Sequence, residues 1–179
     1  MKGNYIDLKS VKLTGSGLEA KYVQNGTELN IKCKEPVHPD LREVFMKLVP
    51  YFVDVCEFDE SDDIDFNNLD DPKTVVDLKK YTVSGLTISG SENSLSIVII
   101  GHKLLESVKT LHINSPRVNI SEELTDIDED KAYHLRELCQ DIVFEVEEYA
   151  INRKYAVQEQ CLPFKDDDKS DPFEEGENG

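Results

Sequence analysis

The chain has 179 residues, with 37 acidic and 20 basic side chains and a formal net charge of -17. This length suffices for one domain with its own apolar core, so neither disulfides nor a metal is needed to stabilise it. The four cysteines lie far apart without a CxxC pair, which argues against a zinc knuckle or a small disulfide framework.

The charge is distributed unevenly along the chain. Residues 54–71 contain nine acids and no Lys or Arg, and residues 165–179 contain seven acids and two lysines. These segments contribute -9 and -5, which leaves -3 for all other residues. A near-neutral body can have a basic strip, so net charge alone does not exclude nucleic acid as a partner. Both acidic segments are equally typical of disordered, solubilising polyelectrolyte.

The first third of the chain predicts antiparallel strands. Apolar residues alternate with polar ones over residues 6–13 and again over 29–33. Asn25-Gly26 precedes the second stretch and is typical of a type I′ hairpin, whose two central positions need positive φ. Residues 15–17, Gly-Ser-Gly, supply an earlier turn.

A helix is predicted next, because apolar residues from Leu41 to Phe52 follow helical spacing. It should begin near Pro39, where a missing amide donor is harmless and where Asp40 complements the helix dipole. Pro50 should kink this helix or end it one turn early. We interpret His38 as a cap or turn residue.

The segment 54–72 is expected to be a flexible acidic loop. Its polar residues also match the ligand spacing of a twelve-residue calcium loop, at Asp59, Ser61, Asp63, Asp65, Asn67 and Asp70. However, Ile64 replaces the Gly needed for the sharp turn, and Asp70 is shorter than the usual bidentate Glu. Pro72 stands where an exiting helix should begin, so we favour a loop over a calcium site.

Two more strands are predicted over 81–88 and 95–100, joined by a turn at 90–93. The second strand is apolar on both faces, which favours a central position covered by a helix on one side. On its other side we expect a second layer or a partner chain, so a homo-oligomer is one alternative. Residues 108–113 predict a third strand, and Val118 and Ile120 continue as an edge strand.

The longest helical pattern begins near Asp130 and ends near Ala150, with one apolar stripe that should cover the second β region. The fold class is therefore α+β, with antiparallel strands and two main helices, in the order β-β-β-α, acidic loop, β-β-β-α. We assign one domain to residues 1–157 and a disordered acidic tail to 158–179. The N-terminus lacks the apolar stretch of a signal peptide, and no apolar run is long enough to span a membrane, so a cytoplasmic location is expected.

Catalytic motifs are not recognisable in this sequence. His38, His102, His112 and His134 fall in different elements, and although His102 and His112 could face each other across a hairpin, no nucleophile is marked beside them. No Walker A loop, GxSxG, GxGxxG or HExxH sequence occurs. We therefore expect no enzymatic activity, cofactor or metal.

Positive charge gathers on the second β region. Sheets that bind single-stranded nucleic acid combine cations with exposed stacking rings. The candidate nucleic-acid-binding residues here, accompanied by His112, are Lys79, Lys80, Tyr81, Lys103, Lys109 and Arg117. The alternative is a solvated sheet face without a ligand.

The tail contains a candidate docking peptide, Gln160-Cys161-Leu162-Pro163-Phe164. It resembles the bacterial sliding-clamp-binding peptide, although Pro163 replaces an aliphatic residue. The Leu-Pro-Phe step before three aspartates also resembles the acidic tip of bacterial single-stranded DNA-binding proteins. In that family the Phe carboxylate is the chain end, whereas fifteen residues follow Phe164 here. These resemblances imply partner binding through Gln160, Leu162, Pro163 and Phe164.

A broader resemblance links several segments of the chain. Pro36-Val37-His38-Pro39-Asp40-Leu41, Ile113-Asn114-Ser115-Pro116-Arg117 and Glu147-Glu148-Tyr149, with the Leu-Pro-Phe ending, look like uncharacterised small proteins of bacteriophages and prophages. That group brings no known catalytic residues. The resemblance implies phage DNA metabolism or takeover of a host protein.

The leading hypothesis is a non-enzymatic accessory protein of phage-type DNA replication or recombination. It would contact single-stranded DNA weakly and recruit a bacterial or phage replication or recombination protein through its tail. The alternative is an acidic decoy or inhibitor that occupies a basic surface of a host or defence protein. An enzyme with an unrecognised site is a third alternative.

Overall fold

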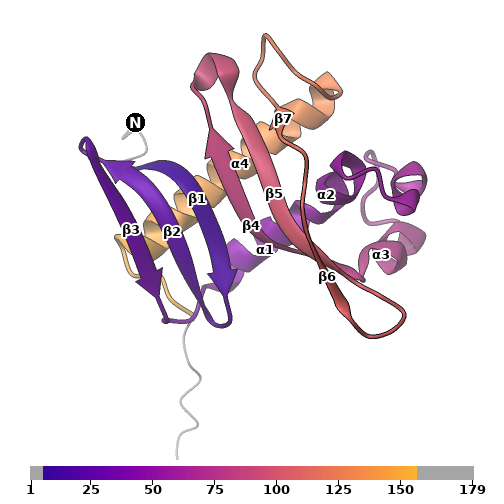
Figure 1. The fold of residues 1–179 in the computed structure, drawn as a ribbon, viewed down its shortest axis with the longest axis horizontal. Helices are drawn as coiled ribbons and strands as arrows, with labels where there is room; N and C mark the ends of the chain where they lie inside the picture. Colours follow the sequence, from indigo (N-terminus) through magenta and orange to yellow (C-terminus); the bar gives the residue numbers. More distant parts are fainter. Residues whose placement is uncertain (1–5, 157–179) are drawn as a thin grey trace, which may run out of the picture.

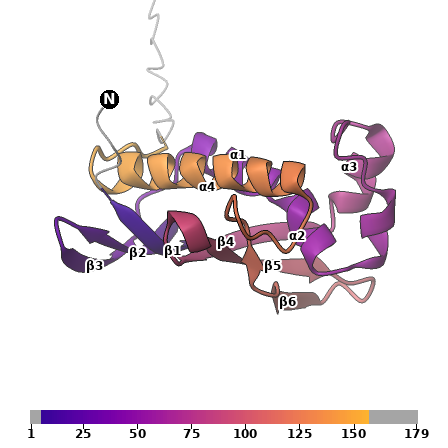
Figure 2. The same ribbon diagram turned by 90° about the horizontal axis from the view of Figure 1, so that it is seen from above.

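The structure is a computed structural model that describes residues 6–156, apart from the side chain of Glu92. The expected acidic tail and its docking residues lie outside the described residues. The described chain forms one seven-stranded antiparallel sheet with helices on one face (Figures 1 and 2). The predicted α+β class is therefore confirmed.

The sheet has the order β3-β2-β1-β4-β5-β6, and the short β7 pairs with β5 beyond β6. Every pairing is antiparallel. The strand bounds are β1 Asp7–Thr14, β2 Gly17–Gln24, β3 Thr27–Cys33, β4 Tyr81–Ser89, β5 Ser96–Leu104, β6 Thr110–Asn114 and β7 Val118–Asn119.

Two topologically equivalent halves make up this sheet. In each half three strands run outward from the centre and a helix follows, with the short β7 between β6 and the helix in the second half. This is the order that the sequence predicts. The central strands β1 and β4 pair through Val11 and Leu86, and both are irregular in register, between Leu8 and Ser10 and between Val83 and Gly85. The two β regions thus form one continuous sheet.

The predicted hairpin at Asn25-Gly26 is confirmed. Both residues have positive φ, 50° and 76°, between β2 and β3. These values suit a type I′ turn, which matches the twist of the two strands.

The first predicted helix begins where expected and is broken by its proline. In α1 (Pro39–Lys47), His38 Nδ1 accepts a hydrogen bond from the Asp40 amide at 3.2 Å, which confirms its capping role. A second helix, α2 (Val49–Val55), starts one residue later with Pro50 in its first turn. A proline is tolerated there because its position lacks an intrahelical acceptor.

The long helix α4 (Glu129–Ala150) lies diagonally over the sheet (Figure 1). Asp128 accepts hydrogen bonds from the amides of Asp130 and Lys131 at its start. Near its end the Tyr149 hydroxyl donates to the Glu35 carbonyl, which follows β3, at 2.6 Å. The helix therefore reaches across both halves of the sheet, beyond the second β region that the sequence analysis assigned to it.

The acidic segment differs from the structureless loop that its charge predicts. It contains a 3-10 helix (Asp59–Asp63) and leads into α3 (Pro72–Leu78), so a helix does begin at Pro72. Phe58 lies 6.1 Å from Phe52 and Phe66 lies 5.2 Å from Tyr51, measured between ring centroids. These aromatic contacts hold the segment against the core despite its charge.

The face of the sheet opposite the helices has no covering layer in the described part of the chain (Figure 2). On β5, Ile97 and Ile99 are buried under the helices, whereas Val98 and Ile100 lie half-buried on the open face. The second layer or partner chain expected over this strand is therefore not seen within residues 6–156. The side chains on this open face define the candidate site.

Candidate nucleic-acid interface

The second half of the sheet is the basic part of an acidic protein. Residues 79–121 include five Lys or Arg and two acids, a net charge of +3, although the whole chain has -17. Strands β4, β5 and β6 contain no carboxylate at all. Nine acids lie in the acidic segment and seven on α4, both on the helix side of the sheet.

Three of the predicted cations are available to a ligand. Lys79, Lys109 and Arg117 are exposed, and their side chains make no ion pair within the described residues. Lys79 precedes β4, Lys109 precedes β6, and Arg117 precedes β7. Lys79 and Lys109 therefore lie where β5 ends, and Arg117 lies near the start of β5. A phosphate backbone that runs along β5 could meet all three.

The other predicted residues, Lys80, Lys103 and Tyr81, contact the carboxylate of Glu60 in the acidic segment. Lys80 forms an ion pair with the Glu60 carboxylate, Lys103 lies 3.7 Å from it, and the Tyr81 hydroxyl donates a hydrogen bond to it. The Lys103 ammonium also lies 5.1 Å from the Phe58 ring centroid and 5.2 Å from that of Tyr81. Tyr81 is only 4% exposed, so its ring cannot stack on a nucleobase.

The contacts of this cluster stabilise the charged form of Glu60. Burial opposes its charged form, but hydrogen bonds from Lys80 and Tyr81, a backbone hydrogen bond and the charge of Lys103 outweigh burial and lower the pKa of Glu60 to about 2. Burial, together with the hydrogen bond to Glu60, raises the pKa of the Tyr81 hydroxyl. The cluster therefore attaches the acidic segment to the ends of β4 and β5.

Two imidazole rings lie on the open face of the sheet. His102 and His112 are directly paired across β5 and β6, with ring centroids 5.7 Å apart, which confirms that they face each other. They share the open face with Thr82, which pairs with His102. Histidine rings can stack on unpaired bases. The sequence analysis weighed the facing pair as catalytic residues and counted His112 alone with the nucleic-acid-binding candidates, although the symmetric spacing of the two histidines about the hairpin marks them as neighbours.

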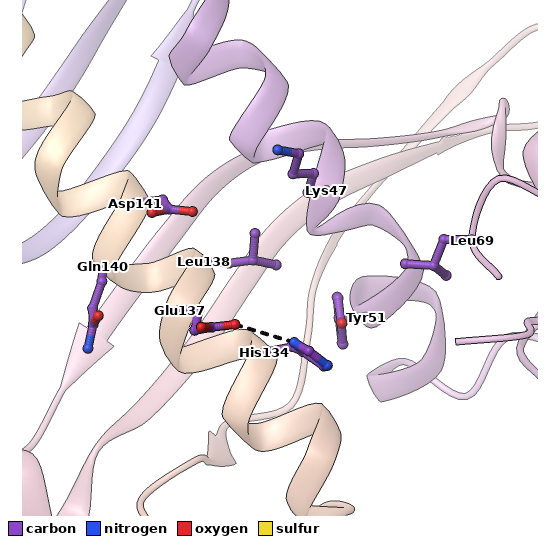
Figure 3. A pocket seen from close by; sticks show the side chains of 8 residues that line it. All are labelled: Lys47, Tyr51, Leu69, His134, Glu137, Leu138, Gln140 and Asp141. Atoms are coloured by element: carbon purple, nitrogen blue, oxygen red, sulfur yellow. Dashed lines mark ion pairs between the residues drawn. The ribbon is translucent and has the colours of Figure 1, made fainter. Parts of the chain in front are cut away.

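A separate cleft of about 390 Å³ lies on the helix side, between α1, α2, α4 and the acidic segment (Figure 3). His134 Nδ1 lies 3.4 Å from a Glu137 carboxylate oxygen at its wall. Burial and the charge of Glu137 raise the pKa of Tyr51, which also lines it. The remaining lining residues are Lys47, Leu69, Leu138, Gln140 and Asp141.

Several carboxylates of the acidic segment have partners within the protein. The Asp65 side chain accepts a hydrogen bond from the Asn67 amide, Asp63 pairs with Lys73, and Asp71 caps α3. Within residues 6–156, no group of three or more His, Cys, Asp or Glu is arranged to hold a metal ion. The ligand spacing seen in the sequence is therefore not gathered around a cation site.

Burial raises the pKa of the Cys56 thiol to about 11 and that of Cys139 to about 12, which makes both thiols poor nucleophiles.

Comparison with known proteins gives no match to a family model, to a curated protein or to a solved structure. None of the described helices is long and apolar enough to cross a membrane. Function must therefore be argued from the site alone.

Proposed function

We propose that this chain is a non-enzymatic accessory protein of phage-type DNA replication or recombination. Its open sheet face would contact single-stranded DNA, and residues Gln160 to Phe164 would recruit a replication or recombination protein. The observation that supports DNA contact best is the separation of charge, because β4, β5 and β6 lack carboxylates in a strongly acidic chain. A uniformly acidic surface would repel phosphates from every side.

The number of free cations sets the expected strength of binding. Lys79, Lys109 and Arg117 can each neutralise one phosphate, so the slope of log affinity against log salt should be about -2 for a single strand. The rings of His102 and His112 add base contacts, each worth roughly 1–3 kcal/mol by the usual range for stacking. This arrangement favours weak, salt-sensitive binding that a recruited partner would reinforce.

The combined change Lys79→Ala, Lys109→Ala and Arg117→Ala should remove most of the salt dependence of binding. By contrast, His102→Ala with His112→Ala should weaken binding at every salt concentration and change the slope less, since it removes base stacking and none of these three cations. Fluorescence anisotropy of labelled single-stranded DNA at several salt concentrations measures both effects. Replacing Lys34, Lys47 and Arg153 by Ala is the control, because these cations lie outside the basic half-sheet.

Unchanged anisotropy at low salt for the unsubstituted chain would contradict DNA contact. That result would favour the alternative of an acidic decoy, which one observation supports. Aromatic contacts hold the acidic segment in place while six of its carboxylates remain exposed, namely those of Glu57, Asp59, Asp62, Asp63, Asp65 and Asp70. A fixed array of acids is suited to a basic protein surface.

Recruitment through the tail is tested separately. Leu162→Ala with Phe164→Ala should abolish capture of a replication or recombination protein from bacterial lysate, because apolar side chains provide most of the affinity of a short peptide. Circular dichroism and thermal melting should not change. The matched control is Phe173→Ala, which alters the second Pro-Phe step of the tail. Recovery of the same proteins by intact and doubly substituted chains would contradict this role.

A further inference from the structure

The four histidines of the chain differ in whether their ring nitrogens have partners. His38 caps α1, and His134 Nδ1 lies 3.4 Å from a carboxylate oxygen of Glu137. By contrast, neither His102 nor His112 forms an ion pair or a side-chain hydrogen bond within residues 6–156. Neutral imidazole is the commonest metal ligand among side chains, and two rings with free nitrogens face each other here.

The pairing of β5 with β6 brings the side chains of His102 and His112 close together. Opposite residues of an antiparallel pair alternate between hydrogen-bonded and non-hydrogen-bonded pairs, and the side chains are closer in the second kind. The Ser115 amide donates to the Ile99 carbonyl at 2.8 Å, and the register from there to His102 has no bulge. Because His102 lies three residues beyond Ile99, its pair with His112 is of the closer, non-hydrogen-bonded kind.

The separation of the two rings fits one metal ion between them. Their centroids are 5.7 Å apart. Zinc–nitrogen bonds of about 2.0–2.1 Å at a tetrahedral ion would place the two ring centroids about 5.2 Å apart. Bringing the rings closer by about 0.5 Å requires only small side-chain rotations, since the regular pairing of the strands already holds both Cα atoms in place.

The surroundings of the two rings select the kind of metal ion. Strands β4, β5 and β6 contain no carboxylate, so they offer no charged oxygen ligand to Mg²⁺ or Ca²⁺. Imidazole nitrogen suits Zn²⁺, Cu²⁺ and Ni²⁺ instead. A pair of histidines is also consistent with the absence, within residues 6–156, of any group of three or more potential ligands.

We propose that His102 and His112 together bind one divalent transition-metal ion on the open face of the sheet, and that this ion contacts a phosphate of single-stranded DNA. Two protein ligands leave two of the four tetrahedral positions of zinc for water or a phosphate oxygen. The metal site itself needs no DNA, whereas its role in DNA binding rests on the proposed function. The sequence alone predicts no metal here, because the two histidines are ten positions apart.

The ion binds as an exchangeable ligand of the folded domain. A histidine that holds a metal usually donates its other ring N–H to a carboxylate or carbonyl, which strengthens the bond to the metal. Neither His102 nor His112 has such a partner among the described residues. Zinc affinity should therefore be moderate, and the apolar core should keep the domain folded when the ion is removed.

The position of the pair explains how the ion takes part in DNA binding. His102 lies along β5 between Arg117, near the start of that strand, and Lys79 and Lys109, near its end. A phosphate backbone that follows β5 therefore passes the ion and meets two added positive charges. A base stacks on the face of an imidazole ring, whereas a metal binds a nitrogen at its edge, so metal binding and stacking are compatible.

NMR of the histidine ring protons in the full-length chain tests the site directly, because there are four histidines to compare. The chain is titrated with Zn²⁺ in a large excess of Mg²⁺, which occupies exposed carboxylates but is a poor match for imidazole. The resonances of His102 and His112 should shift together and saturate at one zinc per chain. Those of His38 and His134 should not shift over the same range of zinc concentration.

Substitution of either ring shows whether both are ligands. His102→Ala and His112→Ala should each weaken zinc binding at least tenfold, about the lower limit of the cost of losing even an outer-shell partner of a metal site. His134→Ala is the matched control and should leave the affinity unchanged in isothermal titration calorimetry. Zinc should also raise the melting temperature of the unsubstituted chain, because it binds the folded state, and this increase should disappear in His112→Ala.

Three results would overturn the metal site. The first is the absence of any shift at His102 and His112, and the second is an equal shift at all four histidines, which would indicate non-specific binding. The third is saturation at one zinc per two chains, with a dimer seen in sedimentation, because the ion would then lie between copies. His112→Ala exposes no core residue, so unchanged circular dichroism should confirm that its loss of zinc is not a loss of fold.

Fluorescence anisotropy with and without Zn²⁺ separates this inference from the proposed function. Zinc should tighten binding of single-stranded DNA by the unsubstituted chain about fivefold, the lower end of the usual coupling between two ligands, and should not do so in His112→Ala. DNA binding without any zinc response of the two histidines would overturn the metal site and leave DNA contact standing. Zinc binding by the pair without DNA binding, with or without the ion, would refute DNA contact and leave the metal site standing.

Discussion

Glu60→Gln should destabilise the domain by about 2–3 kcal/mol at neutral pH, the usual range for losing a largely buried charge partner. The Glu60 side chain is 17% exposed and faces Lys80 and Lys103, which would be left without their carboxylate. The glutamine oxygen can still accept the Tyr81 hydroxyl, so the loss is mainly electrostatic. Urea unfolding followed by circular dichroism measures this difference.

The same variant should show a distinct pH dependence. Because the folded domain lowers the pKa of Glu60 from 4.5 to about 2, its stabilising effect is complete above pH 4.5. The effect is lost as the pH falls from 4.5 through 2, since protonated Glu60 no longer pairs with the lysines. The difference in stability between the unsubstituted chain and Glu60→Gln should therefore shrink over this window. Glu43→Gln, at an exposed ion pair with Lys47, is the control and should change stability little.

A second measurement links Glu60 to the DNA interface. Glu60→Gln frees Lys80, which has the same strand parity as Thr82 on the open face, so the salt slope for single-stranded DNA should steepen by about 0.7, the value for one added phosphate contact. A variant that is less stable yet binds DNA more tightly is not expected from simple damage to the fold. A stability difference that stays constant between pH 7 and pH 2 would contradict the role of this carboxylate.

The elements that the sequence predicts well are those with local causes. The Asn25-Gly26 turn needs two positive φ angles, and the helix at Pro39 needs only a cap and an apolar stripe, so both are readable from neighbouring residues. The joining of β1 to β4 is different, because these strands are separated by more than sixty residues. Periodicity predicts each strand but does not specify which strands pair.

The acidic segment was misinterpreted because its charge conceals its aromatic residues. Phe58 and Phe66 are eight residues apart with Ile64 as the only apolar residue between them, so too few apolar side chains are present to define a helix or a strand. Their partners, Phe52, Tyr51 and Tyr81, lie in other elements, so the anchoring becomes visible only in three dimensions. Rules that predict disorder from amino-acid composition use charge and hydrophobicity, and they do not detect isolated aromatic contacts of this kind.

The candidate site was predicted in part. The structure leaves Lys79, Lys109 and Arg117 exposed, whereas it places Tyr81 among the buried residues. The sequence did indicate this burial. Tyr81 and Val83 are two residues apart in one strand, so their side chains share the apolar face of the sheet. The pairing of Lys80 and Lys103 with Glu60 was not predictable, since it depends on how the acidic segment folds back over the sheet.

Gly101→Ala should also destabilise the domain strongly, by about 2–3 kcal/mol, as overpacking of a well-filled core usually does. A Cβ atom at Gly101 would lie 2.6 Å from the Thr82 carbonyl oxygen and 2.9 Å from two ring atoms of Phe52. Phe52 is fully buried, so its ring has little room to move. Without these contacts the same change would be expected to add about 0.4–1 kcal/mol of stability, because Ala restricts the unfolded chain.

A double-mutant cycle tests this explanation and its link to the site. Phe52→Leu removes the ring atoms that the new methyl group would meet, so the two changes together should be less destabilising than the sum of the single changes. Rescue should be partial, since the Thr82 carbonyl remains in place. His102 follows Gly101 in β5, and Thr82 is its partner in β4, so a shift of this backbone should also weaken DNA binding. Strict additivity of the two stability changes would show that the Phe52 contact does not explain the glycine.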